Sequence, residues 1–220
     1  MVDVNKVRQI ILKDWKVESR QSFAIYGILL FAATTVFIVF KSFNSINPRE
    51  WSILLWIILL FSGLNAVLKS FLQEKKETWS YYYTLFNPIE ILISKLFYNF
   101  LFLALLFLLI TILMNVFMGN PIRFLPMFIS GNILGIIGVS IVFTFVSLVS
   151  ASIDGSHHTM MAVLSMPLIL PIILLSLKVT QVSTGLLVDT SIYTDIWLLF
   201  GIDILLFGVV LILFPYLWRA

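Results

Sequence analysis

The sequence predicts an all-α integral membrane protein with six transmembrane helices and an N-terminal amphipathic helix. Hydrophobic residues make up 60% of the 220 residues, and the mean hydropathy is +1.06. Charged residues make up 11%, against roughly 25% in soluble domains. Six apolar runs, each long enough to cross a bilayer, are separated by polar segments. These observations predict a single transmembrane domain over residues 1–220.

The first expected element, within residues 1–21, is an interfacial helix. At about 100° per residue, one face collects the apolar side chains Val4, Val7, Ile11, Leu12 and Trp15. The opposite face collects the basic side chains Lys6, Lys13, Lys16 and Arg20. A helix of this kind lies in the interface of an anionic leaflet. The alternative is a plain orientation signal. A secretory signal peptide is not expected, because the first twenty residues are too charged.

The apolar runs predict spans over about residues 23–40, 51–68, 96–118, 124–151, 160–177 and 196–218. Two helix starts are signalled by an asparagine, a proline and a glutamate in capping-box spacing, beginning at Asn47 and at Asn87. Residues 154–159 are expected to form a tight turn. Residues 178–195 are expected to form a polar loop with a short re-entrant or surface segment at its apolar centre.

The basic residues predict the orientation. An even number of spans puts both termini on one side. With the termini in the cytoplasm, outer segments hold only four of the fourteen lysines and arginines: Lys41, Arg49, Arg123 and Lys178. This bias favours cytoplasmic termini in a bacterial inner membrane. It also explains the pI of 9.2 through residues at membrane ends, so nucleic-acid binding is not expected.

The polar interruption at residues 69–95 is the strongest candidate for a partner surface. It begins with charges, continues with aromatic residues and ends in a capped helix. Tyrosine and tryptophan favour the membrane surface because each ring has an apolar body and a polar atom. We expect this cytoplasmic coupling segment to dock a soluble partner that supplies energy, through Glu74, Lys75, Lys76, Glu77, Trp79, Tyr82 and Phe86.

Asp203 lies inside the sixth apolar run. A carboxylate at mid-membrane costs about 2.5–3.5 kcal/mol, so it is expected to face protein or water. It lies on the order of 10 Å from the outer end of the run, within expected reach of Lys178 or Arg123. Two interpretations stay open: a substrate or gating contact, and a structural hydrogen bond between helices.

Pro167 and Pro171 lie in the fifth run. Each removes a backbone donor and frees a carbonyl of the preceding turn. Lipid cannot satisfy these carbonyls, so the segment is expected to be buried in protein or to line a cavity. A moving kink and a static kink are both compatible with the sequence.

Small and amide side chains in the spans suggest helix contacts. Gly131, Gly135 and Gly138 share one face of the fourth span, and Gly201 and Gly208 share one face of the sixth. Packing within the subunit is the first interpretation, and a dimer contact is the second. Interhelical hydrogen bonds are expected for Asn65, Asn99, Asn115 and Asn132.

Several chemistries are not supported. The chain has no cysteine, which excludes disulfides, thiolate metal sites and a CxxCH haem attachment within it. His157 and His158 are adjacent and do not share a helical face, so we expect no metal site and no bound cofactor. Neither a GxxxxGK[ST] loop nor an HExxH or GxSxG motif occurs. No catalytic residues are assigned.

Three stretches carry a resemblance to a known family. They are residues 71–95, where an acidic run precedes a proline-containing turn; MAVLSMPLILPIILL, Met161–Leu175, with two prolines four apart; and the ending GIDILLFGVVLILFPYLWRA, with Asp203, Pro215 and Trp218. With the plan of spans, they resemble the haem exporter protein B family (CcmB). The chain departs from the family pattern at two places. The family commonly has Asp-Gly where this chain has Glu77-Thr78. It has Ser-Pro-x-Pro at the positions of Leu85–Pro88, where this chain has only the last proline.

The resemblance implies an ABC-2-type permease architecture and a subunit of the cytochrome c maturation system. It implies three kinds of partner: a cytosolic ABC ATPase subunit, a second copy of this chain, and haem-handling membrane proteins. Haem is the implied substrate, either exported or carried by a chaperone whose release uses ATP. The alternatives are a permease for a lipid, glycan or drug, and a membrane scaffold without a transport cycle. A membrane enzyme is the least favoured class.

Overall fold

The computed structural model describes residues 4–20, 22–43, 45–67, 87–152, 157–187, 189 and 191–219. These residues form helices and connecting turns, with no strand among them. The helices are α1 (Val4–Arg20), α2 (Ser22–Ser42), α3 (Pro48–Val67), α6 (Pro88–Met118), α7 (Leu125–Ser152), α8 (His157–Ser183) and α9 (Ile192–Arg219).

The all-α membrane fold is confirmed. Five helices are long and apolar enough to cross a membrane, over Pro48–Val67, Pro88–Met118, Leu125–Ser150, Met160–Ser183 and Ile192–Tyr216. In α2 the corresponding apolar stretch is shorter, Tyr26–Ser42. The described residues therefore give five candidate spans and a shorter apolar helix within α2, which fits the predicted plan of six apolar helices.

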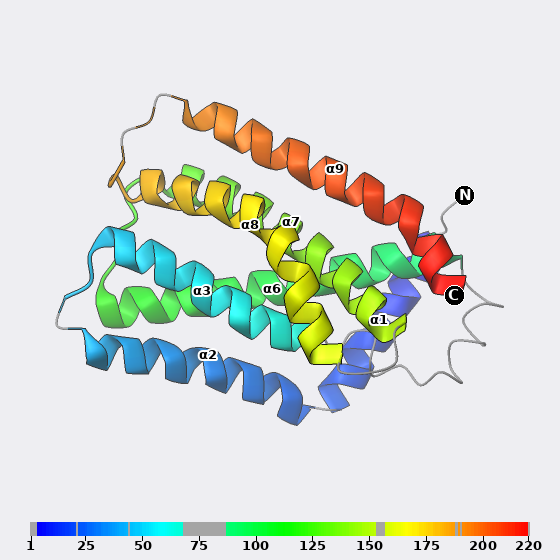
Figure 1. Cartoon of the computed structure of the whole chain (residues 1–220). Coiled ribbons are helices and arrows are strands. Elements are labelled where there is room, and N and C mark those ends of the chain that lie inside the picture. The colour runs from blue at the N-terminus through cyan, green and yellow to red at the C-terminus, as the bar shows by residue number, and fades with distance from the viewer. Residues whose placement is uncertain are drawn as a thin grey trace.

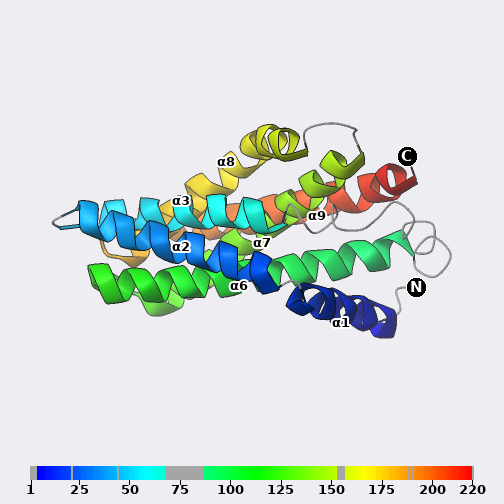
Figure 2. The ribbon, with the colours of Figure 1, turned by 90° about the horizontal axis from the view of Figure 1, so that it is seen from below.

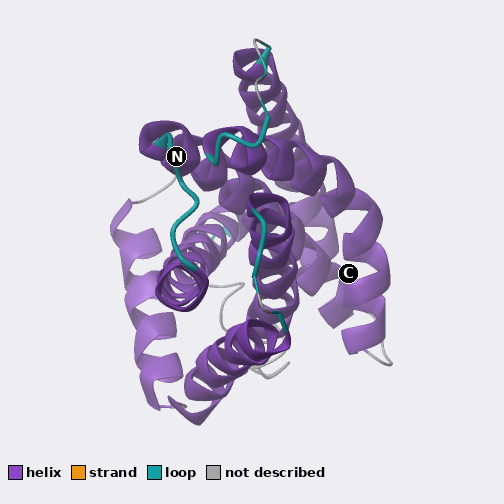
Figure 3. Cartoon of the chain, turned by 90° about the vertical axis from the view of Figure 1, so that its left-hand side faces the viewer, coloured by secondary structure: helices purple, strands orange, loops and turns teal. Residues whose placement is uncertain are grey.

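The long helices lie side by side, and successive ones run in opposite directions (Figure 1). Both termini lie at one end of the bundle, where α1 lies beside the beginning of α6 (Figures 1 and 2). We call this the α1 end. The opposite end carries the connections α2–α3, α6–α7 and α8–α9, and Figure 3 looks onto it.

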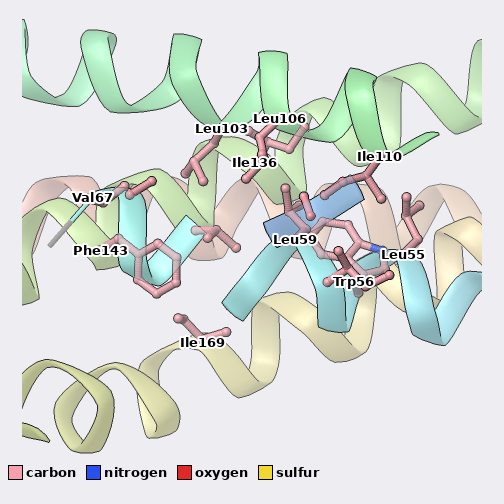
Figure 4. Close-up of a cluster of buried hydrophobic side chains, with 14 of the residues drawn as sticks. Leu55, Trp56, Leu59, Val67, Leu103, Leu106, Ile110, Ile136, Phe143 and Ile169 are labelled. Carbon is pink, nitrogen blue, oxygen red and sulfur yellow. The ribbon is translucent and has the colours of Figure 1, made fainter. Parts of the chain in front are cut away.

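Helix α7 is the central helix of the bundle. It packs most extensively against α8 and α9, and it also contacts α6 and α3. The core between these helices is filled by large side chains, including Trp56 and Leu59 of α3, Leu106 of α6 and Phe143 of α7 (Figure 4). Since lipid tails are as apolar as these side chains, close packing and hydrogen bonds hold such helices together.

Both predicted helix starts are confirmed. The Asn47 amide donates a hydrogen bond to Glu50 Oε2 at 3.1 Å, and the Asn87 amide donates one to Glu90 Oε2 at 3.1 Å. Helix α6 therefore begins at Pro88, eight residues before its apolar run. Its 31 residues extend about 46 Å, so its first turns project beyond a hydrocarbon core of about 30 Å.

The predicted loop over residues 178–195 is wrong in extent. Helix α8 continues to Ser183 and α9 already begins at Ile192. The polar residues are compatible with a helix because the Ser183 hydroxyl donates to the Thr180 carbonyl at 2.6 Å. The chain then turns at Gly185, whose φ of +73° lies in the left-handed region that glycine adopts without strain. The expected re-entrant or surface segment lies partly outside the described residues, which include Leu186 and Leu187 but not Val188.

Helix α8 also begins earlier than predicted. His157 and His158 lie in its first turn and not in the preceding loop. Their side chains, and residues 153–156, lie outside the part of the chain that the structure describes.

Candidate functional site

Helix α1 packs against α6 with a side other than the apolar face that was predicted to lie in the membrane interface. Ile10 and Asp14 are buried, whereas Leu12 and Trp15 of the predicted apolar face are exposed. Ile10 packs in a small core at the α1 end with Leu92 of α6 and neighbouring apolar side chains of α7 and α9. Helix α1 therefore has one side on the protein and leaves its largest apolar side chains facing outward.

An ion pair fixes this contact. Lys95 Nζ of α6 lies 3.1 Å from Asp14 Oδ2, and Lys13 Nζ lies 2.8 Å from Asp14 Oδ1. The Lys95 and Asp14 side chains are only 5% and 9% exposed, whereas Lys13 is 36% exposed. A buried pair contributes little net stability, but it specifies one arrangement because each partner is costly to leave alone.

The first turn of α6 supports the pair. Glu90 is 1% exposed, and its carboxylate caps the helix through the Asn87 amide. An acidic group at a helix N-terminus is favourable because the unpaired N–H groups carry positive partial charge. The beginning of α6 is thus held by its own cap and by α1.

The predicted docking residues Glu74, Lys75, Lys76, Glu77, Trp79, Tyr82 and Phe86 lie outside the described residues. The described helices that flank them, α3 and α6, end and begin toward the α1 end of the bundle (Figure 1). Of the predicted coupling segment 69–95, residues 88–95 form the first two turns of α6.

Asp203 is buried in α9, with 4% exposure. Among the described residues, neither of its carboxyl oxygens has a hydrogen-bond partner. It lies against α7, because a β-carbon added at Gly138 would meet Asp203 Oδ1. It also lines a cavity of about 420 Å³ between α6, α7 and α9. Asp203 therefore does not form, with any residue that the structure describes, the interhelical hydrogen bond considered for it.

The expected approach of Lys178 or Arg123 to Asp203 is wrong. Lys178 Nζ lies 2.7 Å from Asp189 and 2.6 Å from Asp195, at the end opposite α1. Arg123 lies against Gly185 in the turn after α8. Lys178 is thus paired with two aspartates at this end, and Arg123 lies beside the turn after α8.

The loop between α8 and α9 is closed by these charges. The hydrogen bond from Lys178, followed by those from Ser191, holds the pKa of Asp189 well below its usual range. Asp189 therefore stays ionised, and its pair with Lys178 is kept, at every pH near neutrality.

The two prolines of α8 also lie differently than predicted. Pro167 and Pro171 are exposed on the outer side of α8, together with Leu170 and Leu174. The expectation that this segment is buried in the chain is therefore wrong for the subunit alone. Helix α8, which contains both prolines, is bent (Figures 1 and 2), as expected of a helix with internal prolines.

The glycines of α7 lie at close helix contacts. A β-carbon added at Gly131 would meet Val179 of α8, and one added at Gly135 would meet Ser176 and, at 2.6 Å, Trp56. Gly138 is the third member of this row, against Asp203 and α8.

The two glycines of α9 differ from those of α7. Added β-carbons at Gly201 and Gly208 would find nothing within 4 Å, so the expected packing of this pair within the subunit is wrong. Gly63 of α3 also lies at a close contact that was not predicted, because a β-carbon added there would meet Leu103 and Phe143. Unlike Gly131, Gly135 and Gly138, Gly63 does not belong to a row of glycines on one face of its helix.

Amide and hydroxyl groups join the helices. Asn99 donates to Thr144 at 2.8 Å, and Asn132 accepts from Thr180 at 2.9 Å, as expected. The Trp56 indole also donates to Thr180, at 3.1 Å.

Within the part of the chain that the structure describes, the other two asparagines form no such bond. Asn65 donates to the Phe61 carbonyl of its own helix. The buried Asn115 Oδ1 has no partner among the described residues. The expectation of interhelical bonds is therefore wrong for these two.

The Asp14–Lys95 pair was missed by sequence analysis, although signals were available. Asp14 lies about one helical turn after Ile10 and Ile11, so an acidic side chain interrupts the row of apolar side chains on that side of the helix. Lys95 lies two turns after a capped helix start, beside an apolar run. Neither signal identifies the partner, because the two residues are far apart in sequence.

Comparison with known proteins gives one match. The family model described as CcmB protein matches residues 5–217. Neither a curated protein nor a solved structure matches the chain. The match covers α1 and all the long helices, in agreement with the resemblance in the apolar runs and the ending. The chain therefore belongs to the CcmB family and is a multi-pass membrane component of the haem export and cytochrome c maturation system.

Proposed function

We propose that this chain is the permease subunit of an ABC transporter for cytochrome c maturation, coupled to a separate cytosolic ATPase. The observation that carries the proposal is the Asp14–Lys95 pair at the α1 end. It joins α1 to the turns of α6 that directly follow the predicted docking residues. A displacement delivered to the segment before Pro88 would therefore move α1 and α6 together.

The coupling follows from the length of α6. It is one helix from Pro88 to Met118, so a push at its first turn is carried through the membrane. ATP binding closes the ATPase pair, the docked segments of two permease subunits move together, and their helices tilt. The central helix α7, which contacts α6, α8 and α9, receives this motion. The ATPase subunit performs the hydrolysis.

The orientation supports this assignment. Both termini, α1 and the helix ends that flank residues 68–86 lie at one end of the bundle (Figure 1). The distribution of lysine and arginine favours this end as the cytoplasmic one in a bacterial inner membrane. A cytosolic ATPase would then reach residues 69–95.

The chemistry of the described spans favours release of a haem-loaded chaperone over passage of haem through this subunit. Haem passage calls for partners of the propionates and for an axial ligand. The cavity between α6, α7 and α9 has an apolar lining apart from Ser140 and Asp203. This lining includes no basic side chain that could pair with a propionate.

We expect reversal of two charges in the coupling segment to disrupt the complex. Glu74→Lys with Glu77→Lys places two cations where the proposal needs anions, and like charges across an interface cost several kcal/mol. The measurement is co-purification of the ATPase from membranes in mild detergent, with an expected loss of roughly tenfold or more.

The control is Arg8→Glu, which reverses an exposed charge on α1 at the same end of the bundle. Undiminished association and ATPase activity in the double variant would refute both the docking surface and the cytoplasmic position of residues 69–95.

We further propose that the outer face of α8 contacts a second copy of this chain. Pro167 and Pro171 free the carbonyls of the preceding turn, which lipid cannot satisfy. Both prolines are exposed in the subunit, so the missing cover comes from outside it. A twofold contact would bring the same α8 face of each copy together.

Cysteine cross-linking tests this face, and the chain has no cysteine of its own. Leu170→Cys and Leu174→Cys place thiols at positions that are 56% and 66% exposed. Leu108→Cys on α6 is the matched control at 61% exposure. We expect a short bis-maleimide to give covalent dimers in membranes from the α8 variants and not from the α6 variant. Equal yields from all three would contradict the assignment.

A further inference from the structure

We propose that α1 binds anionic phospholipids, with one side of the helix against their acyl chains and another side against their headgroups. The sequence predicts a helix with two sides, one apolar and one basic. In the structure a third side of α1 is occupied by protein. The inference goes beyond the proposed function, because it depends neither on an ATPase nor on the substrate.

The described part of α1 has three sides, which are centred about 120° apart on a helix of 3.6 residues per turn. Ile10 and Asp14 form the side that packs on α6 and in the small core at the α1 end. The second side is apolar, and the third is basic and polar. In order around the helix, these two sides consist of Ile11, Trp15 and Leu12, followed by Lys16, Gln9, Lys13 and Lys6.

The apolar side of α1 is open to the surroundings of the protein. Trp15 and Leu12 are both exposed, and tryptophan favours the depth at which hydrocarbon meets headgroups. Arg8 also lies on this side, about one turn before Leu12. The stem of an arginine lies along apolar groups while its charge stays in water, so Arg8 is compatible with an apolar environment.

The depth of α1 follows from the exposed residues of α6. An apolar row on the outer side of this helix runs from Phe97 to Val116 and also contains Leu101, Leu105, Leu108 and Ile112. Its two ends are nineteen residues apart, or about 28 Å, which matches a hydrocarbon core of about 30 Å. Lys95, the partner of Asp14, lies two residues before this row. Helix α1 therefore contacts α6 where the hydrocarbon core ends.

Helix α9 gives the same boundary. Trp197 and Tyr216 are exposed and are also nineteen residues, or about 28 Å, apart. Aromatic residues of these types favour the two surfaces of a membrane. Tyr216 follows Phe214, which belongs with Ile10 of α1 to the small core at the α1 end. Two helices thus place α1 at the level of the lipid headgroups, and Figure 1 shows α1 oblique to the long helices.

The charge of α1 favours an anionic headgroup. Residues 5–16 contain one acidic side chain, Asp14, which is paired, and four basic ones: Lys6, Arg8, Lys13 and Lys16. Lys16 is exposed and lies next to the apolar side, so its ammonium group can reach the phosphate of a lipid whose acyl chains contact Leu12. Each basic residue near an anionic membrane surface strengthens attachment by about fivefold.

A soluble protein is a poorer occupant of this surface. At the level of the headgroups it would reach Trp15 and Leu12 only by displacing the lipid beside the bundle. A phospholipid contacts the apolar and the basic side of α1 at once, because its acyl chains and its headgroup belong to one molecule.

Nitroxide labels in the full chain test the position of α1, in vesicles of phosphatidylcholine and phosphatidylglycerol. The chain has no cysteine, so Leu12→Cys on the apolar side and Gln9→Cys on the polar side each give one labelled site. We expect the label that replaces Leu12 to collide more with oxygen than with a water-soluble nickel complex, and the label that replaces Gln9 to show the reverse. Equal access of nickel to both labels would overturn the proposal, and so would protection of the Leu12 site from both reagents.

Photoactivatable lipids test the choice of headgroup in the same vesicles. Phosphatidylglycerol and phosphatidylcholine that carry the same diazirine in an acyl chain are compared, and the labelled residues are mapped by mass spectrometry. We expect phosphatidylglycerol to label residues 5–16 about fivefold more than phosphatidylcholine, or by a larger factor. Lys16→Gln is expected to lower this preference by about fivefold. Lys41→Gln, which removes an exposed lysine at the opposite end of the bundle, is expected to leave it unchanged.

Three results would overturn the recognition of an anionic headgroup: equal labelling of α1 by the two lipids, an unchanged preference in Lys16→Gln, and an equal loss in both lysine variants. Both substitutions change exposed side chains. If Lys16→Gln does not fold, the comparison of the two lipids on the unaltered chain decides.

Discussion

Replacing Lys95 by alanine is expected to lower the free energy of unfolding by about 3–5 kcal/mol, because Asp14 is left as a buried charge without its partner. The two groups lie 3.1 Å apart and are almost fully buried. Lys13 also contacts Asp14, but its side chain is 36% exposed, so it replaces Lys95 only in part. Thermal unfolding in detergent, followed by tryptophan fluorescence, measures the loss.

A double-mutant cycle separates the pair from its surroundings. Asp14→Ala is expected to cost a similar amount, and the variant that lacks both charges less than the sum, because no unpaired charge remains. Arg8→Ala removes an exposed charge from the same helix and is expected to cost less than about 0.5 kcal/mol. If Lys95→Ala is no more destabilising than Arg8→Ala, the pair does not fix α1 to α6.

Gly135→Ala is expected to destabilise the chain by about 1–3 kcal/mol, the usual cost of overpacking a filled core. The added methyl group would lie 2.6 Å from the Trp56 ring and closer still to the Ser176 side chain. Both neighbours are themselves buried, so neither can withdraw without moving α3 or α8. The midpoint of thermal unfolding in the same detergent measures the effect.

Gly208→Ala is the matched control on α9. An added β-carbon there would meet nothing within 4 Å, and alanine favours a helix over glycine. This variant is expected to be neutral or slightly stabilising. An equal loss of stability in both variants would show that the contacts of Gly135 with Trp56 and Ser176 do not set the cost of Gly135→Ala.

Local rules were sufficient for several features. The helix starts at Asn47 and Asn87 follow from side chains three residues away, so the sequence alone predicts them. The row Gly131, Gly135 and Gly138 follows from helical periodicity, and the structure places each glycine against a neighbouring helix.

Predictions that depended on contacts between residues far apart in sequence were less reliable. The burial of Asp203 was expected from the cost of a carboxylate in lipid. Its supposed partner Lys178, however, pairs with Asp189 and Asp195 at the end opposite α1. The prolines of α8 were expected inside the subunit and face outward. The rule that freed carbonyls need cover does not say which molecule provides it.

Composition and the spacing of apolar residues thus sufficed for a helical membrane protein and for the order of its helices. Both depend on the length and polarity of contiguous segments. The attachment of α1 to α6, the isolation of Asp203 and the outward face of α8 needed the folded arrangement. These features depend on which residues far apart in sequence meet, and periodicity along one helix carries no information about its neighbour.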